Sequence, residues 1–510
     1  MSLSSLSARV APAVFRLPGR LTPAMLEAAA APIDVVLGGD ARDRITACRD
    51  FALHCGNGTK QIYGMHTGFG PLVGFPGRAD SADQCDNTFA HLGAGHGPDL
   101  TPAVVRATML ARLWSLARGR SGVSMPVIEG LVAALRTGVA PAVPRIGSVG
   151  ASGDLIPLSY LARALGGDGH AYLDGVRLSA AAALELAGLT PWELTGRDAL
   201  ALVNGISLTA AAAGLAAAGL RRSHSVALLL SALLTDVLGS DPVFLSAGLL
   251  TAFGHPGPEE AARRMRGLLA GTVASGTRPL QEPYSIRCVP QLAGAVETSI
   301  RHAEAVVCND LNGVSDNPLF FAERGEVVHG GNFFGQPSAF AADILAMGAT
   351  QLGNLAERQL DLLVDPHRNG GLPPVLSPDP GRQHGVQGVQ LAATATVVAM
   401  RRATVPASVQ SVPTNMHNQD VVPFGTQAAF TALDLAGSLR WLHGSLGVAL
   451  RQAVHVGGRR PTAPACAEAL EALIEAVPPV AVDRPLDHDV HAAADTLDGL
   501  VSRGEPFGGL

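Results

Sequence analysis

The tripeptide Ala151-Ser152-Gly153, inside the segment 146–162, has the residue types for an unusual backbone reaction. Gly153 carries the least hindered backbone nitrogen, and Ala151 leaves its carbonyl carbon almost uncovered. A strained loop could press this nitrogen onto this carbon and close a five-membered ring. Loss of water, including the Ser152 hydroxyl, would leave an exocyclic methylene. The product would be a methylidene-imidazolone, an electrophile made without an external cofactor. The plainer interpretation is a glycine-rich turn in which Ser152 and Asp154 cap the helix that follows.

Other catalytic patterns are missing. The sequence has no P-loop and no H-E-x-x-H. GFGPLVG (68–74) lacks the third glycine of a dinucleotide loop, and GASGD (150–154) misses the nucleophile-elbow pattern by one residue. A group of acidic and histidine residues near the C-terminus could be drawn as a metal cluster. At the start of a predicted helix, however, it fits a solvent-facing cap better. We therefore predict no metal and no nucleotide cofactor. The group consists of Asp487, His488, Asp489 and His491.

The run IGSVGASGDLIPLSYLA (146–162) resembles the aromatic amino acid ammonia-lyases and 2,3-aminomutases, which include histidine, phenylalanine and tyrosine ammonia-lyases. The resemblance extends from about residue 20 to residue 500, with eight further motifs in the family's order. It implies that Ala151, Ser152 and Gly153 form the methylidene-imidazolone autocatalytically. The further motifs are YGMHTGFGPLV (63–73), RDALALVNGIS (197–207), QEPYSIRCVPQLAG (281–294), SDNPLF (315–320), HGGNFFGQ (329–336), LAERQ (355–359), NGGLPP (369–374) and PTNMHNQDVV (413–422).

By this resemblance, Tyr63 is the base that removes the β-proton of the substrate, on a glycine-rich loop where Gly70 allows close approach. If the resemblance is set aside, the plainer interpretation of Tyr63 is a half-buried tyrosine that is hydrogen-bonded to the backbone. A tyrosine base near neutral pH needs its pKa lowered by about three units, or roughly 4 kcal/mol, and helix N-termini are the expected source. Arg287 matches the arginine that pairs with the substrate carboxylate, and a structural salt bridge is its alternative. Asn204 resembles the residue that holds the ring oxygen of the electrophile and the substrate carboxylate.

The resemblance places five further residues around the substrate. For Gln281, Tyr284 and Phe333, an ordinary core or loop role stays open. Asn418 and Gln419 follow the pattern of tyrosine and phenylalanine lyases, whereas histidine lyases typically carry Glu at the second position. The sequence therefore disfavours histidine as the substrate.

The pair His91-Leu92 predicts the substrate. Tyrosine lyases typically carry His-Leu here, phenylalanine lyases Phe-Leu and histidine lyases Ser-His. An imidazole can exchange a hydrogen bond with a phenol, and Leu92 can pack on the ring, so the pair penalises a substrate without the hydroxyl. In the alternative, His91 bonds only a loop carbonyl.

We predict a tyrosine ammonia-lyase that converts L-tyrosine to trans-p-coumarate and ammonia. The alternatives are a tyrosine 2,3-aminomutase, a phenylalanine ammonia-lyase or a catalytically dead structural relative. Three residues depart from the family pattern and could favour the mutase, namely His66, Met416 and His417. His66 could instead alter loop closure or favour a ring-substituted substrate.

Long apolar periodicities determine the predicted fold class, which is mainly α. Four helical patterns would form a bundle, preceded by a mixed N-terminal region that carries the glycine-rich catalytic loops. We expect an N-terminal domain at 1–205, a central long-helix bundle at 206–456 and a short C-terminal helical segment at 457–510. The helical patterns cover residues 207–238, 291–311, 338–364 and 426–456.

Composition indicates a soluble cytoplasmic protein. Charged residues make up 16% of the chain, the net charge is −6, and no basic stripe suggests nucleic acid. Six scattered cysteines without C-x-x-C indicate reduced thiols. The most apolar stretch, 208–238, is interrupted by polar residues at its centre, so we expect no membrane span. Low charge hints at covered subunit surfaces, and the resemblance implies a homotetramer with active sites shared between subunits.

Overall fold

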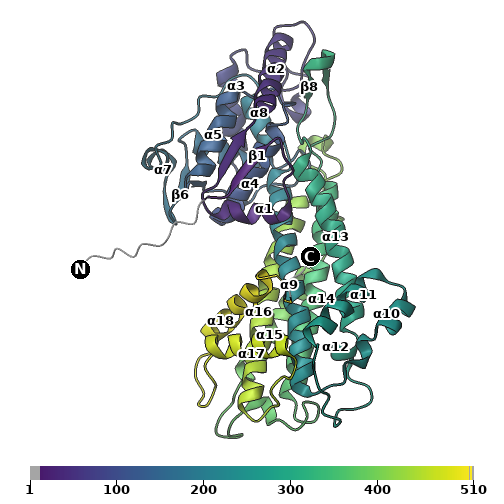
Figure 1. The fold of residues 1–510 in the computed structure, drawn as a ribbon. Coiled ribbons are helices and arrows are strands. Elements are labelled where there is room, and N and C mark those ends of the chain that lie inside the picture. The colour runs from purple at the N-terminus through teal and green to yellow at the C-terminus, as the bar shows by residue number, and fades with distance from the viewer. Residues whose placement is uncertain (1–11, 505, 508–510) are drawn as a thin grey trace, which may run out of the picture. The chain divides into compact units, whose positions relative to one another are not determined.

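The computed structural model describes residues 12–504 and 506–507 (Figure 1). The chain forms two compact units, each assembled from several stretches. The first comprises Met1–Leu215, Glu304–Ala341 and Pro406–Phe430, and the second comprises Ala216–Ala303, Ala342–Val405 and Thr431–Leu510, in each case within the described residues. The predicted division into 1–205, 206–456 and 457–510 stays a prediction.

Four long helices occur where the sequence periodicity places them, and the mainly α fold class is confirmed. Each contributes residues to both units. Alanine and leucine dominate the first of them, which favours helix and close packing. The four are α9 (Ser207–Leu238), α13 (Val289–Asn312), α14 (Gln336–Val364) and α16 (Gly425–His455).

The first unit contains short strands and medium-length helices, as expected of the mixed N-terminal region. β1 (Val14–Leu17) pairs in parallel with β2 (Asp34–Leu37). The antiparallel pairings are β3 (His96–Asp99) with β5 (Pro144–Ile146), β6 (His170–Leu173) with β4 (Ala140–Pro141) and β7 (Val176–Ser179), and β8 (Leu319–Phe321) with β9 (Glu326–Val328). The helices are α1 (Pro23–Glu27), α2 (Gly39–Gly56), α3 (Ser81–Leu92), α4 (Pro102–Leu116), α5 (Met125–Arg136), α6 (Leu155–Leu165), α7 (Ala180–Leu186) and α8 (Asp198–Val203).

The second unit is helical throughout its described elements. Besides its parts of the long helices, it contains α10 (Ala247–Phe253), α11 (Pro256–Leu268), α12 (Tyr284–Arg287), α15 (Gln387–Ala403), α17 (Pro464–Ala476) and α18 (Asp487–Ser502). Asp487 and His488 stand exposed at the start of α18. The described part of the chain holds no group of three or more His, Cys, Asp or Glu residues able to bind a metal.

One described helical stretch, Asp198–Leu238, is long and apolar enough to cross a membrane by length and composition alone. Its most apolar window is 94% buried within the chain, as for the core helix of a soluble protein. All six cysteines are free thiols.

Candidate active site

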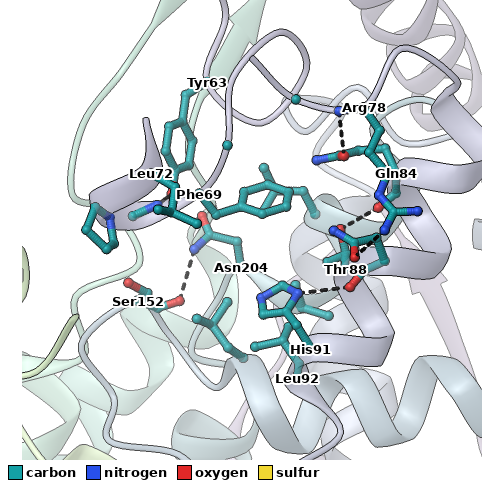
Figure 2. A pocket seen from close by; sticks show the side chains of 18 of the residues that line it. Tyr63, Phe69, Leu72, Arg78, Gln84, Thr88, His91, Leu92, Ser152 and Asn204 are labelled. Carbon is teal, nitrogen blue, oxygen red and sulfur yellow. Dashed lines mark hydrogen bonds between the residues drawn. The ribbon is translucent and has the colours of Figure 1, made fainter. Parts of the chain in front are cut away.

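A cavity of about 500 Å³ in the first unit collects six of the residues singled out from the sequence, namely Tyr63, Gly70, His91, Leu92, Ser152 and Asn204 (Figure 2). It is lined by the loop that follows Tyr63, one face of α3, Ser152 and Leu155, the end of α8, and Asn415. This size suits a small organic molecule. The lining includes Tyr63, Phe69, Gly70, Leu72, Arg78, Gln84, Asn87, Thr88, His91, Leu92, Ser152, Leu155, Leu200, Val203, Asn204 and Asn415.

Tyr63 faces the cavity from the start of its loop. The Gly70 N–H donates to the phenol oxygen at 2.8 Å, and the backbone N–H of Tyr63 donates to His329 Nε2 at 3.2 Å. Gly70 has φ +56°, and a Cβ there would lie 3.6 Å from Nδ2 of Asn415. Burial raises the pKa of the Tyr63 phenol, while the Gly70 N–H and the charge of Arg197 act against the rise. The lowered pKa expected from the sequence is therefore not produced by the described residues.

The tripeptide Ala151-Ser152-Gly153 is held in a conformation that requires glycine at its third position. Ala151 and Gly153 are buried, whereas Ser152 is half-buried and lines the cavity. Gly153 has φ +73°, and a Cβ on it would lie 2.4 Å from the carbonyl oxygen of Gly205. The positive φ and this close approach both require glycine. The serine side chain is thus the part of the tripeptide presented to a ligand.

Two amide side chains bond Ser152. Asn204 Nδ2 donates to the Ser152 carbonyl oxygen at 2.9 Å (Figure 2), and Gln419 Nε2 donates to its hydroxyl at 2.6 Å. Thr414 Oγ1 donates to Oε1 of Gln419, which fixes the orientation of that amide. Oδ1 of Asn204 is buried without a partner among the described residues. The two amides therefore bond the carbonyl that cyclisation would keep as the ring oxygen and the hydroxyl that it would remove as water.

Asp154 connects the tripeptide to the helices around it. Its buried carboxylate accepts the Thr209 N–H at 2.9 Å, the Thr209 hydroxyl at 2.8 Å, and the hydroxyls of Thr426 and Ser148, both at 2.9 Å. Burial raises the pKa of this carboxyl, and the four donors oppose the rise. Because α6 begins at Leu155, three helices, α6, α9 and α16, begin next to this carboxylate, and their N-terminal dipoles favour negative charge here.

Buried arginines hold the short helix α8, which ends just before Asn204. Arg112 donates to the Ala201 carbonyl and, at 3.3 Å, to the Asn204 carbonyl. Burial lowers the pKa of Arg112 to about 10. At the other end of α8, Arg197 and Asp316 form an ion pair at 2.9 Å with both side chains fully buried. These contacts fix the backbone from which the Asn204 amide reaches Ser152.

His91 lies on the cavity face of α3. Its Nδ1 is 2.9 Å from the Asn87 carbonyl oxygen, which can only accept, so Nδ1 carries the hydrogen. In the neutral ring, Nε2 is then an acceptor, and no described residue bonds it. The ring of Phe69 stacks on the imidazole at a centroid distance of 6.0 Å and meets the Tyr63 ring edge-on at 6.1 Å. Phe69 therefore lies between Tyr63 and His91 (Figure 2).

Comparison with known proteins identifies the family of this chain. Residues 21–477 match the family described as aromatic amino acid lyase. A tyrosine ammonia-lyase of Cereibacter sphaeroides is 38% identical over 491 residues, which is 91% of this chain and 93% of the relative. The chain belongs to the aromatic amino acid lyase family.

Other relatives carry other names. A histidine ammonia-lyase of Symbiobacterium thermophilum is 37% identical over 481 residues, 92% of this chain and 93% of the relative. A solved tyrosine aminomutase from Streptomyces globisporus has a TM-score of 0.89 at 33% identity and covers 96% of this chain and 98% of its own. The comparisons thus include lyases for two amino acids and a mutase.

The structure of this aromatic amino acid lyase does not bring every predicted residue to the cavity. Gln281, Tyr284 and Arg287 belong to the second unit. Tyr284 is 71% exposed, and the guanidinium of Arg287 lies 4.8 Å from the centre of its ring. The guanidinium of Arg287 makes no hydrogen bond or ion pair with any described residue, and its buried Nε has no partner. The salt bridge considered from the sequence is therefore absent from the described residues.

Other residues singled out from the sequence also lie outside the cavity lining, among them Phe333, Asn418, His66 and Met416. Phe333 and Asn418 are in the first unit, but neither lines the cavity. His66 bonds the backbone through both ring nitrogens, to the Ile62 N–H at 3.0 Å and the Gly56 carbonyl at 2.8 Å. Met416 is 83% exposed.

Sequence reasoning missed several residues of the cavity. Phe69 and Asn415 both lie inside motifs that were identified, but no spacing rule shows that they face the ligand. Helical spacing could have found the others, because positions 84, 87, 88 and 91 follow the pattern i, i+3, i+4, i+7 of one helix face. That face carries Gln84, Asn87, Thr88 and His91.

Proposed function

We propose that the chain is a tyrosine ammonia-lyase that converts L-tyrosine to trans-p-coumarate and ammonia. The orientation of His91 carries this proposal. Because Nδ1 bonds the Asn87 carbonyl, Nε2 is left as an acceptor that a phenol hydroxyl can satisfy. Leu92 is buried beside it and Phe69 stacks on it, so the surroundings suit an aromatic ring with one polar end.

The residues around the tripeptide fit a methylidene-imidazolone formed from Ala151, Ser152 and Gly153. The Ser152 carbonyl, which would become the ring oxygen, accepts from Asn204, and the hydroxyl that must leave accepts from Gln419. The glycine that supplies the nitrogen tolerates no Cβ. Such a group would supply an electrophilic carbon that captures the substrate amine and makes it a leaving group.

The chain's own side chains perform the remaining tasks. Tyr63 as phenolate takes the β-proton, the C–H electron pair forms the Cα=Cβ bond, and the C–N pair leaves with nitrogen. The Gly70 N–H, 2.8 Å from the phenol oxygen, stabilises its negative charge. Arg287, whose side chain has no ion pair among the described residues, would bind the substrate carboxylate through two parallel bonds where a neighbouring subunit supplies it to the cavity. Asn204 retains the orphaned Oδ1 that can accept a hydrogen bond from the ligand.

Incubation with L-tyrosine tests the proposal. Ultraviolet absorbance should show growing coumarate, and chromatography should show no β-tyrosine. Accumulated β-tyrosine would instead identify a tyrosine 2,3-aminomutase, the second candidate, which the likeness to the Streptomyces globisporus aminomutase favours. Faster turnover of phenylalanine or histidine would contradict the tyrosine assignment. No product from any of the three amino acids would contradict the enzymatic function itself.

We also propose a cytoplasmic homotetramer whose active sites combine residues of different subunits. Apolar side chains exposed on the single chain support assembly, among them Leu391 at 67% and Leu280 at 99%. Mixing the inactive variants Tyr63→Phe and Arg287→Ala under subunit exchange should restore some activity if the two residues come from different chains. A monomer by light scattering would contradict the assembly.

A further inference from the structure

The cavity continues past His91 along α3 to a group of polar side chains that the proposed reaction does not use. Gln84, Asn87 and Thr88 lie on the same helix face as His91 and line the cavity, and Arg78 joins them from the preceding loop (Figure 2). His91 is near the C-terminal end of α3, and Gln84 is about two turns away, roughly 10 Å along the axis. A ligand that reaches His91 therefore has these side chains beyond it.

Arg78 determines how two of these side chains point. Its backbone N–H donates to Oε1 of Gln84 at 3.1 Å, and its Nη2 donates to Oδ1 of Asn87 at 3.0 Å. Since both amide oxygens are used as acceptors, both NH2 groups are directed elsewhere. Neither NH2 group has a partner among the described residues. Gln84 as a whole is only 7% exposed.

The charge of Arg78 is already balanced, because its Nη1 lies 2.6 Å from a carboxylate oxygen of Asp83. The region beyond His91 is therefore rich in amide donors without a large net positive charge. A neutral hydrogen-bond acceptor satisfies such donors, whereas an apolar group would leave them unpaired at a cost. A negatively charged ligand gains less binding free energy here, because the guanidinium of Arg78 is already paired with Asp83.

We propose that Asn87, oriented by Arg78, selects substrates whose aromatic ring carries a neutral hydrogen-bond acceptor next to the phenol hydroxyl, as in a 3-hydroxylated tyrosine. This inference rests on the proposed function. The para hydroxyl donates to His91 Nε2, and the neighbouring oxygen accepts from Asn87 Nδ2. His91 and Asn87 are one helical turn apart, and the 2.9 Å bond from His91 Nδ1 to the Asn87 carbonyl keeps the imidazole over that turn.

Two substrates of nearly equal size test the proposal on the purified enzyme. Wild-type protein should have kcat/KM for 3-hydroxytyrosine at least tenfold above that for 3-methyltyrosine, whose substituent cannot accept a hydrogen bond. Asn87→Leu removes the donor at similar volume and should reduce this ratio to about one. The matched control is Asp86→Ala, an exposed neighbour on α3 outside the cavity lining, which should leave the ratio unchanged.

A second variant keeps the proposal falsifiable if Asn87→Leu does not fold. Asn87→Asp retains an acceptor for Arg78 and replaces the NH2 donor by a negatively charged carboxylate oxygen, so it should lose at least tenfold in kcat/KM for 3-methoxytyrosine, whose oxygen can accept but not donate. Equal kcat/KM of wild type for the hydroxy and methyl substrates, with tyrosine still turned over, would overturn this inference and leave the proposed function standing. Failure to convert any aromatic amino acid would overturn the proposed function, and this inference with it.

Discussion

Replacing His91 with phenylalanine removes the acceptor, Nε2, that we assign to the phenol hydroxyl of the substrate. The change is local, because a phenylalanine ring can keep the stacking on Phe69 at 6.0 Å. The lost bond from Nδ1 to the Asn87 carbonyl leaves no buried donor behind, since the imidazole leaves with its own hydrogen. We therefore expect the variant to fold and to differ mainly in substrate preference.

The size of the change in kcat/KM follows from the burial of the phenol hydroxyl under the bound substrate ring. His91 is exposed in the free chain, so water satisfies Nε2 until a substrate ring covers it. Covering a phenol without a partner then costs about 1–3 kcal/mol, or roughly 5- to 150-fold in kcat/KM for tyrosine. Phenylalanine gains, because its ring no longer covers an unpaired imidazole nitrogen. Together, the ratio of kcat/KM for tyrosine over phenylalanine should fall by about tenfold to several hundredfold.

Steady-state kinetics with both substrates measure this ratio. His96→Phe is the matched control, since His96 is exposed on β3 and does not line the cavity, and it should leave the ratio unchanged. If His91→Phe slows both substrates equally, the imidazole is not the selector. The tyrosine assignment would then lose its main support.

Three further predictions concern the base, the tripeptide and the fold. Burial raises the pKa of Tyr63 and the base form is the phenolate, so kcat/KM should rise about tenfold per pH unit above neutrality; a flat profile would contradict this. Gly153→Ala places a Cβ 2.4 Å from a backbone oxygen, so it should keep its unmodified mass and show no activity; an active variant would refute the close contact. Asp316→Ala leaves Arg197 buried without its carboxylate and should lower the free energy of unfolding in urea by about 3–5 kcal/mol. Glu129→Ala, at an exposed ion pair, should cost less than about 1 kcal/mol, and equal losses would contradict the argument.

The sequence predicted the long helices well because their periodicity is a local property. The pattern at 207–238 coincides with α9 (Ser207–Leu238). Motifs also led to Tyr63, Ser152 and Asn204, which the structure places at one cavity. The tripeptide was identified because its residue types could cyclise and lose water, and the structure adds why glycine is required at its third position.

Other features depend on contacts between distant residues and leave no trace in spacing. Arg112 supports Asn204 through a backbone carbonyl 92 positions away, which no sequence pattern encodes. The pKa of Tyr63 was expected to be lowered by helix ends, but burial is its largest influence and raises it. The departure at His66 suggested a role in loop closure or substrate choice, whereas its ring is bonded to backbone at both nitrogens.

The mass of the intact, denatured protein tests most directly whether the tripeptide becomes an electrophile. Wild-type chain that converts L-tyrosine should be lighter than its sequence by two waters, one from the Ala151 carbonyl oxygen and one from the Ser152 hydroxyl. Ser152→Ala should have its full sequence mass, an unchanged circular dichroism spectrum and almost no activity. An active wild-type enzyme at its full sequence mass would contradict the account.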